Sequence, residues 1–402
     1  MKVIFFFSLF IILYTYIGYG VLLFTLVKFK RLYKGKLEVK GFPESDLPKV
    51  TFVVAAYNEE DWIENKIKNC LEFDYPKEKI EFLFVTDGSS DETPNKVENF
   101  PFDAGVKWSL YHSDERKGKI AAVERIMEFI DTPITIYTDA NTFVNKMAIR
   151  NIVAHYADPK VGAVAGEKRV SMEEVDSANS AGEGFYWKYE SSLKKWDSEL
   201  YSVVGAAGEL FSLRTKLYQA VPKDTVIEDF FMTLKIAMQG YLVRYEAGAY
   251  AVESASASVG EELKRKIRIS AGGLQAISRL TPLLNIFKYG VLSFQYISHR
   301  VLRWTLTPLA LIVLLIVNIP LALNGNLFFV LTFMGQVAFY TAALVGYLLE
   351  KQKLKFKVFF IPYYFCVMNY SVYLGFFRFI KGSQSVVWEK AKRLETENQA
   401  IK

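Results

Sequence analysis

The sequence predicts an α/β domain with a mostly parallel sheet, inserted between transmembrane helices. Between residues 48 and 280, short apolar runs alternate with stretches of helical spacing, which is typical of parallel strands joined by helices. Long runs without a charged residue lie on both sides of that segment. Acidic clusters follow several of the short runs, at the positions where open α/β sheets bind ligands.

The first apolar run, residues 3–27, contains no charged residue and is longer than a helix needs to cross a hydrocarbon core. A cleaved signal peptide is the alternative, but the run is too long for one and lacks a clear cleavage site. Basic residues follow the run at Lys28, Lys30, Arg31, Lys34 and Lys36. By the positive-inside rule, we expect an integral protein of the plasma (inner) membrane with a cytoplasmic central domain.

Four short apolar runs in the central segment are predicted to be strands: residues 50–56, 81–85, 135–138 and 161–165. The intervals carry helical stripes, one at Ile63, Ile67, Cys70 and Leu71, and another at Ile120, Val123, Ile126, Met127 and Ile130. This order predicts one open sheet covered by helices.

Three more uncharged runs, residues 304–323, 327–349 and 358–377, predict C-terminal spans. Four spans would place the basic tail opposite the central domain, so either the last run is re-entrant or the segment at 283–294 inserts. The expected division is an N-terminal transmembrane helix at 1–28, the domain at 48–280, a membrane-interface segment at 281–303, transmembrane helices at 304–380 and a tail at 381–402.

Composition narrows the class of protein. Of the 402 residues 51% are hydrophobic, and the formal net charge is +6. The basic residues gather near the ends of the apolar runs, where anionic lipid headgroups explain them, and no nucleic-acid-binding module is present. Cys70 and Cys366 give no disulfide framework, which suits a reducing compartment. A transporter is disfavoured because the spans lack ionisable residues.

Two predicted strands end in oxygen-bearing side chains. Asp87, in the run Asp87-Gly88-Ser89-Ser90-Asp91, can accept hydrogen bonds from a uracil or a ribose, although an ordinary Asx turn is the alternative. Asp139 and Asn141 present two oxygen ligands that suit a hard divalent cation bound to a diphosphate. A helix N-cap at Asn141 or Thr142 is the competing interpretation.

Cationic and acidic residues also precede predicted helices. Lys119 stands where helix N–H groups and cations meet phosphate oxygens, although a solvated charge run is the alternative. Glu228 and Asp229 begin another helix, where one acid can serve as a general base or merely cap the helix. An ordinary Asp, with a pKa of about 3.9, is already ionised at neutral pH. Arg268 lies on a cationic helix that either closes over a pyrophosphate or contacts anionic lipid.

Together these residues resemble the membrane-bound family 2 glycosyltransferases, which include hyaluronan, chitin, cellulose and poly-N-acetylglucosamine synthases. The resemblance covers nearly the whole chain. Residues 53–59 resemble the family's opening strand, whose turn holds the nucleotide base and contains here Ala55, Tyr57 and Glu59. Asp87 matches the uridine-contacting Asp, and Lys119 matches the Lys of the Gly-Lys segment near the nucleotide.

The remaining motifs match incompletely. Asp139-Ala140-Asn141 resembles the Asp-x-Asp metal motif, and Ile227-Glu228-Asp229 resembles the Thr-Glu-Asp motif whose Asp is the base. The Gln-x-x-Arg-Trp motif corresponds to residues 265–269, where Arg268 is kept but Ile269 stands in place of Trp. That departure weakens the prediction of processive synthesis.

The resemblance implies a GT-A fold and inverting transfer of a hexose or N-acetylhexosamine from a nucleotide sugar, expected to be UDP-linked, to a growing polysaccharide or oligosaccharide. Asp229 would deprotonate the acceptor, while Mg²⁺ or Mn²⁺ on Asp139 and Asn141 would offset diphosphate charge with help from Lys119 and Arg268. Weaker candidates for the acceptor path are Trp187, Gly208 and Glu209. Transfer of one sugar to a membrane lipid is the alternative, and a homo-oligomer is left open.

Overall fold

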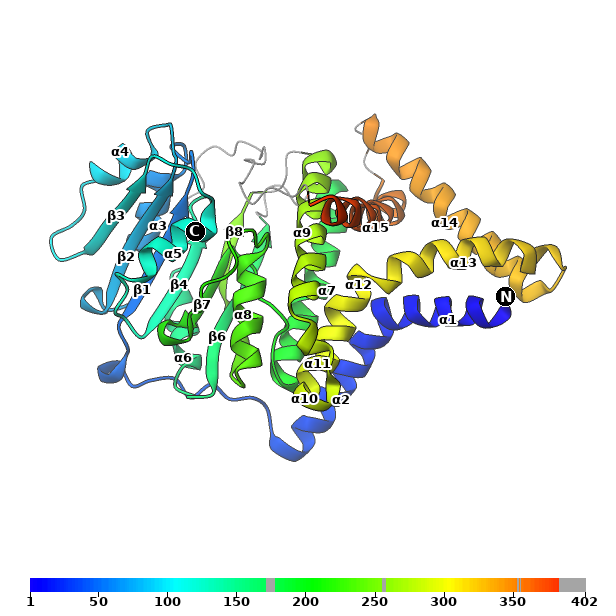
Figure 1. Ribbon diagram of the computed structural model, residues 1–402, viewed down its shortest axis with the longest axis horizontal. Coiled ribbons are helices and arrows are strands. Elements are labelled where there is room, and N and C mark those ends of the chain that lie inside the picture. The colour runs from blue at the N-terminus through cyan, green and yellow to red at the C-terminus, as the bar shows by residue number, and fades with distance from the viewer. Residues whose placement is uncertain (171–177, 255–257, 353, 355, 383–402) are drawn as a thin grey trace.

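The computed structural model of the chain describes residues 1–170, 178–254, 258–352, 354 and 356–382. Of the expected tail at 381–402, the part beyond residue 382 lies outside the described residues. A sheet domain and a group of long apolar helices lie on opposite sides of two upright helices, α7 (Ala178–Leu200) and α9 (Val259–Arg279) (Figure 1).

Within the described residues, eight strands form one mixed sheet in the order β3-β2-β1-β4-β7-β6-β8-β5. The strands are β1 (Val50–Ala56), β2 (Ile80–Asp87), β3 (Lys107–Ser113), β4 (Ile134–Asp139), β5 (Phe143–Val144), β6 (Val161–Val170), β7 (Leu210–Arg214) and β8 (Leu242–Glu253). The four predicted strands correspond to β1, β2, β4 and β6. The expected parallel pairing holds from β3 through β4 and between β6 and β8. However, β7 runs antiparallel to both neighbours, and β5 runs antiparallel to β8.

Helices cover both faces of the sheet because successive side chains of a strand point to opposite faces. In β1, Phe52 and Val54 belong to the core under α3, α4 and α6, whereas Val53 belongs to the core under α5 and α8. The bounds of these helices are α3 (Ile63–Leu71), α4 (Thr93–Glu98), α5 (Lys119–Met127), α6 (Ala148–His155) and α8 (Glu228–Met238). Short 3-10 turns occur at Glu44–Asp46, Lys77–Lys79, Thr215–Leu217 and Thr281–Leu284.

Four helices in the described part of the chain are long and apolar enough to cross a membrane, and they mark it as a membrane protein. The first comprises α1 (Lys2–Leu13), a π-helical turn (Tyr14–Gly18) and α2 (Tyr19–Lys34), and the others are α13 (Leu306–Leu323), α14 (Leu327–Lys351) and α15 (Lys357–Lys381). All four predicted apolar runs are therefore helical. Phe5 of α1 packs against Leu314 and Leu321 of α13, and α1 and α13 lie side by side (Figure 1).

Of these helices, α15 packs closely against α9 of the sheet domain. A Cβ atom added to Gly375 would come within 2.7 Å of the Ser270 Cβ and 2.9 Å of the Ala271 nitrogen. Val259, at the beginning of α9, shares a buried cluster with Phe360 and residues that follow it. The last predicted span is thus held against the same helix that carries Arg268.

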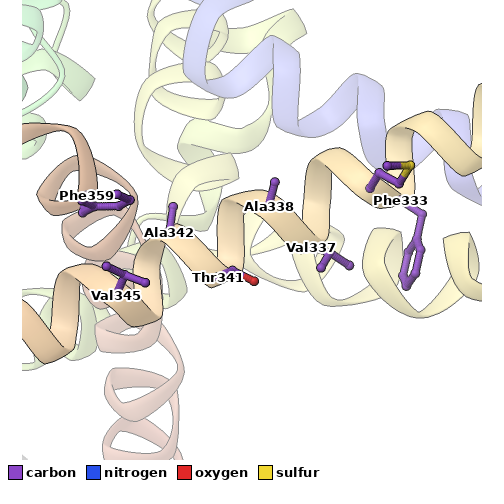
Figure 2. Close-up of a pocket in the computed structure, with 8 residues that line it drawn as sticks. Phe333, Val337, Ala338, Thr341, Ala342, Val345 and Phe359 are labelled. Carbon is purple, nitrogen blue, oxygen red and sulfur yellow. The ribbon is translucent and has the colours of Figure 1, made fainter.

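An apolar groove of about 610 Å³ runs along α14 (Figure 2). Its lining comprises Phe333, Met334, Val337, Ala338, Thr341, Ala342, Val345 and Phe359. Thr341 alone among these side chains bears a hydrogen-bonding group, and α14 is a candidate span. The groove therefore suits hydrocarbon rather than a nucleotide or a sugar.

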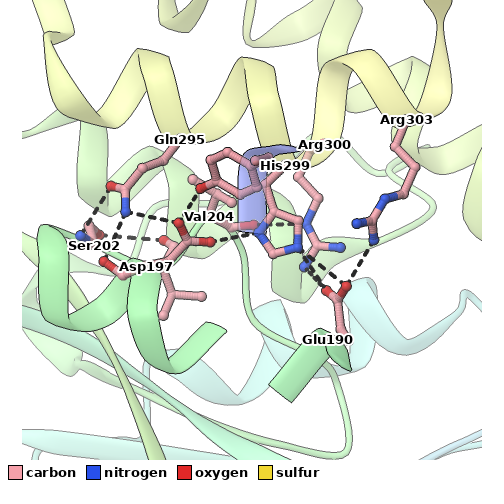
Figure 3. Close-up of polar contacts among 10 residues, drawn as sticks. Glu190, Asp197, Ser202, Val204, Gln295, His299, Arg300 and Arg303 are labelled. Carbon is pink, nitrogen blue, oxygen red and sulfur yellow. Dashed lines mark hydrogen bonds and ion pairs between the residues drawn. The ribbon is translucent and has the colours of Figure 1, made fainter. Parts of the chain in front are cut away.

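The interface segment connects α9 to the C-terminal helices through α10 (Ile286–Tyr289), α11 (Val291–Tyr296), a π-helical turn (Ile297–Val301) and α12 (Leu302–Trp304). A buried polar group, here called the junction cluster, joins this segment to α7 and α2 (Figure 3). Its members are Tyr19, Glu190, Asp197, Gln295, His299, Arg300 and Arg303.

Each acid of the junction cluster, Glu190 and Asp197, has several partners within the cluster. His299 Nδ1 lies 2.6 Å from Asp197 Oδ2, and Nε2 lies 3.2 Å from Glu190 Oε1. Glu190 also pairs with Arg300 at 2.8 Å and Arg303 at 2.9 Å. Burial raises the pKa of Glu190, but the Arg300 and His299 charges outweigh that effect and hold the pKa well below its usual range. The Tyr19 hydroxyl and the Gln295 amide donate to Asp197.

Candidate active site

The carboxyl ends of the central strands and the beginnings of two helices bring the predicted acids and Lys119 together. Asp87 is the last residue of β2 and Asp139 the last residue of β4, while Lys119 begins α5 and Glu228 begins α8. Lys119 Nζ lies 2.7 Å from Asp139 Oδ1 and 3.2 Å from Glu228 Oε1. Burial lowers the pKa of Lys119, but the two acids outweigh it and raise that pKa well above its usual range.

Asp87 holds the loop before α5 with one carboxylate oxygen. Its Oδ2 atom accepts hydrogen bonds from the backbone nitrogens of Lys117 at 2.9 Å and Gly118 at 2.6 Å. Its Oδ1 atom is buried, has no hydrogen-bond donor among the described residues and lies 3.7 Å from Arg125 Nη1. Asp87 therefore has an acceptor oxygen to offer an N–H or O–H group of a ligand.

The turn after β1 forms a wall of the same region. The Ala55 carbonyl accepts a hydrogen bond from Ala140 N at 3.1 Å, which ties β1 to the loop after Asp139. The Tyr57 ring lies 3.6 Å from the guanidinium carbon of Arg116, and Glu59 N donates to Thr93 Oγ1 at 2.8 Å. The three predicted residues of this turn are thus held by both neighbouring loops.

Asp139 and Asn141 fit a divalent cation whose coordination shell is completed by other ligands. Asn141 Oδ1 is buried and accepts no hydrogen bond from the described residues, so it is a ready neutral oxygen ligand. No group of three or more His, Cys, Asp or Glu side chains in the described residues has the geometry of a metal site, so diphosphate oxygens and water would supply the other ligands. The helix-cap interpretation of Asn141 is wrong, because strand β5 and not a helix follows it.

Asp229 differs from the ordinary Asp that the sequence suggested. Burial, reinforced by the neighbouring Glu228 charge, raises its pKa to about 7 although Lys119 opposes the shift. A pKa near the working pH suits a general base, because such a base is both ionised and proton-accepting. Gly208 faces this carboxylate, since an added Cβ would lie 3.7 Å from Asp229 Oδ2 and 3.3 Å from Lys119 Nζ.

Glu209, a predicted acceptor-path residue, is paired with two cations. Its carboxylate lies 2.6 Å from Lys168 Nζ and 3.1 Å from Arg265 Nη2. Burial raises the pKa of Glu209, but these two cations outweigh burial and hold the pKa well below its usual range. The ring centroid of Trp187 lies 5.4 Å from Lys168 Nζ and 5.2 Å from Lys266 Nζ. Trp187 and Glu209 therefore share Lys168 as a neighbour, and Glu209 follows Gly208, which faces Asp229.

Arg268 lies within electrostatic reach of the acids. Burial lowers the pKa of its guanidinium, and the charges of Glu228, Asp229 and Asp139 oppose that shift. Arg268 thus lies within electrostatic reach of the same acids that surround Lys119. The sequence did not single out Lys66 or Lys168. Only the position of Lys66 could have been noticed from sequence, because this lysine lies among Ile63, Ile67 and Cys70 of a predicted apolar helix stripe.

Comparisons with known proteins agree with this geometry. The sequence model of the family described as "Glycosyl transferase family 2" matches residues 51–221. A poly-beta-1,6-N-acetyl-D-glucosamine synthase from Staphylococcus aureus (strain MSSA476) is 27% identical over 243 residues, which cover 58% of this chain and 57% of that protein. The synthase of the same name from Staphylococcus epidermidis is 21% identical over 344 residues, 80% of this chain and 81% of its own length.

A solved structure shares the fold over most of the chain. The mannosyltransferase PcManGT from Pyrobaculum calidifontis, in complex with GDP-Man and Mn²⁺, is 23% identical with a TM-score of 0.68, covering 93% of this chain and 98% of that one. The match includes the apolar helices as well as the sheet domain, because the uncovered part of the chain is too short to contain those helices. The chain therefore carries a family 2 glycosyltransferase domain of GT-A fold between helices long and apolar enough to cross a membrane.

Proposed function

We propose that the protein is an inverting glycosyltransferase that moves a sugar from a nucleotide sugar to a growing polysaccharide or oligosaccharide at the membrane. The observation that carries this proposal is the Asp229 carboxylate, whose pKa is raised to about 7. It lies against Gly208 and beside the Lys119–Asp139 ion pair. A base, a cationic group and a pair of oxygen ligands thus meet where open α/β sheets bind ligands.

In the proposed reaction, Asp229 takes the proton of an acceptor hydroxyl. The hydroxyl oxygen then forms a bond to the anomeric carbon from the face opposite the nucleotide, and the bond between that carbon and the diphosphate oxygen breaks. The electron pair leaves with the nucleoside diphosphate, whose charge Lys119 and Arg268 stabilise. Asp139 and Asn141 would hold a divalent cation, which when bound offsets diphosphate charge. The single displacement inverts the anomeric configuration.

The nucleotide of the donor is proposed to be UDP, with GDP as the second candidate. Asp87 Oδ1 is a buried acceptor without a donor among the described residues, and both uracil and guanine carry ring N–H groups that suit it. PcManGT was solved with GDP-Man. Incubating the purified protein with UDP-GlcNAc, UDP-glucose and GDP-mannose, and measuring nucleoside diphosphate release, tests the proposal. Release from none of them, with and without oligosaccharide or lipid acceptors, would contradict it.

Transfer of one sugar to a membrane lipid is a second candidate function. Ile269, which stands where the resembling enzymes have Trp, offers no flat aromatic face to an acceptor sugar. Trp187 is the candidate for this role, because its ring centroid lies 5.4 Å from Lys168 Nζ, which pairs with Glu209 at 2.6 Å. Sizing the products at high donor concentration separates a polymer from a single addition.

The sheet domain is proposed to face the cytoplasm. Basic residues lie at the end of the first candidate span, and two of them also contact α7. Lys30 Nζ donates to the Glu199 carbonyl at 2.7 Å, and Arg31 pairs with the Glu199 carboxylate at 2.6 Å. The direction of insertion follows the positive-inside rule, and UDP and GDP sugars would then reach the site from the cytoplasm. Protease digestion of inside-out and right-side-out vesicles tests this topology, because only the exposed domain is cleaved.

Adding charge at Asn141 is expected to strengthen cation binding. In Asn141→Asp, a carboxylate replaces a neutral ligand, so the Mn²⁺ concentration for half-maximal activity should fall roughly tenfold. The control is Asn99→Asp, which adds the same charge at an exposed position after α4. An Mn²⁺ requirement that is the same in both variants would remove Asn141 from the cation site.

The rate of transfer is expected to depend on the ionisation of Asp229. Because its pKa is raised to about 7, the ionised form that accepts the proton is lost as pH falls through that value. The value of kcat/KM should therefore fall about tenfold per pH unit below 7 and level off above it. Initial rates measured between about pH 5.5 and 8.5 check this dependence. A flat profile down to the lowest pH would contradict the assignment.

A further inference from the structure

A lysine is buried beneath the loop that carries Asp139 and Asn141. Lys66 belongs to α3, and its exposed fraction is 0%. Burying an ammonium group costs free energy unless the group is hydrogen-bonded or paired. The contacts of Lys66 therefore identify the structure that this charge serves.

Within the described residues, the hydrogen bonds of the Lys66 ammonium go to the two residues that bracket the segment from Asp139 to Asn141. Its Nζ atom donates to the Thr142 carbonyl oxygen at 2.5 Å and to Thr138 Oγ1 at 3.1 Å. Thr138 immediately precedes Asp139, and Thr142 immediately follows Asn141. One side chain thus fixes the two ends of the segment that presents both oxygen ligands.

The two threonines extend this network to the rest of the site. Thr142 Oγ1 donates to the Asp139 carbonyl at 2.9 Å, which closes the loop on itself. Thr138 Oγ1 donates to the Glu209 carbonyl at 2.9 Å, and Glu209 follows Gly208, which faces Asp229. Lys66 is therefore linked through Thr138 to both the cation side and the base side of the site. Chains of buried hydrogen bonds of this kind restrict the geometry of the groups that they join.

Asn69 provides a comparison on the same face of α3. Its amide exchanges two hydrogen bonds of 2.8 Å with the backbone of Val144 in β5. Asn69 thus ties α3 to the chain beyond the loop, whereas Lys66 ties it to the residues on each side of Asp139 and Asn141. Both side chains stabilise the fold, but only Lys66 contacts the residues adjoining the two oxygen ligands.

We propose that Lys66 is a positioning residue for the nucleotide and cation site. By bonding Thr138 and Thr142, it holds the Asp139 carboxylate and the Asn141 amide in place for a divalent cation and the diphosphate of the donor. This inference rests on the proposed function, which supplies the donor and the cation.

The direction in which Mn²⁺ affinity changes on replacing Lys66 distinguishes a positioning role from an electrostatic one. A buried ammonium close to a cation site repels a divalent cation, so removing charge alone would tighten cation binding. Removing a residue that orients metal ligands weakens metal binding by about 10–100-fold. Lys66→Met keeps the length of the side chain and removes both the charge and the donors, so we expect the dissociation constant of Mn²⁺ to rise about 10–100-fold.

The full-length protein in detergent is titrated with Mn²⁺ in the presence of UDP or GDP. Electron paramagnetic resonance measures the concentration of free Mn²⁺. It needs no turnover. Asn69→Leu is the matched control, because it removes polar bonds from the same helix face; its thermal midpoint should fall while its Mn²⁺ dissociation constant stays within about twofold of the parent. If Lys66→Met does not fold, Thr138→Val carries the test, since it breaks the bonds to Lys66 and to Glu209.

Each outcome decides a separate point. Weaker Mn²⁺ binding in Lys66→Met or Thr138→Val, but not in Asn69→Leu, supports the positioning role. Unchanged or tighter binding in a folded variant overturns it and leaves the proposed function intact. If the parent protein takes up no Mn²⁺ with either nucleotide, the cation site and this inference are wrong, whereas nucleoside diphosphate release decides the proposed function separately. Equal weakening in Asn69→Leu reduces Lys66 to a general contributor to stability.

Discussion

Asp229→Asn is expected to lower kcat by about 10²–10⁴-fold, the contribution of a general base, while nucleotide binding changes little. The amide keeps the shape of the side chain but cannot accept the acceptor proton. Nucleotide binding should persist because the residues expected to contact the nucleotide, among them Asp87, lie on elements other than α8. Turnover assays and calorimetry with UDP and GDP measure the two effects separately.

The neighbouring acid provides the control for that variant. Glu228 pairs with Lys119 at 3.2 Å, so Glu228→Gln should act on the donor side and raise the KM for the nucleotide sugar more than it lowers kcat. An Asp229→Asn enzyme that retains most of its turnover would show that another group accepts the proton. Loss of nucleotide binding in the same variant would show instead that the change distorts the site.

Asp197→Ala is expected to lower the free energy of unfolding by about 3–5 kcal/mol, as for other buried ion pairs that lose one partner. Asp197 accepts hydrogen bonds from Tyr19 and Gln295 and pairs with His299 at 2.6 Å. Its removal leaves those buried groups without their acceptor, and the lost bonds join three elements that are distant in sequence.

Thermal unfolding of the detergent-solubilised protein measures this loss. The control is Asp224→Ala, because Asp224 pairs with Arg279 at 2.5 Å with its own side chain 69% exposed. Exposed pairs contribute about 0–1 kcal/mol, so the control should unfold almost like the parent. Similar midpoints for the two variants would mean that the junction cluster adds little to stability.

Strands could be predicted where the pattern of apolar residues within the strand itself is clear. The strands β1, β2 and β4 are buried on both faces, so they appear as short continuous apolar runs. The strands β7 and β3 were not predicted. The strand β7 enters between β4 and β6, and its antiparallel direction is set by pairing partners far away in the chain. The strand β3 lies at the edge of the sheet and is half-buried, so its sequence lacks a strong apolar pattern.

The site was predictable for a related reason. Acids at the ends of strands can be placed from sequence because the carboxyl ends of parallel strands share one edge. The raised pKa of Asp229 could not be predicted from sequence. Burial and the Glu228 charge raise that pKa and Lys119 lowers it, and both the burial and the approach of Lys119 arise only on folding. Lys66 was missed because a lysine among apolar residues is more often an exposed member of the helix than a buried one.

The junction cluster also bears on how the chain is assembled. Glu190 and Asp197 are synthesised about a hundred residues before His299, Arg300 and Arg303, as the 109-residue separation of Glu190 from His299 shows. Both acids therefore remain hydrated until the interface segment has emerged and docked, which makes closure of the cluster a late event. A fragment ending at residue 280 would keep the acids and lack His299, Arg300 and Arg303. Closure of the junction cluster thus requires the segment that leads into the C-terminal helices, and a fragment without that segment leaves Glu190 and Asp197 without three of their partners.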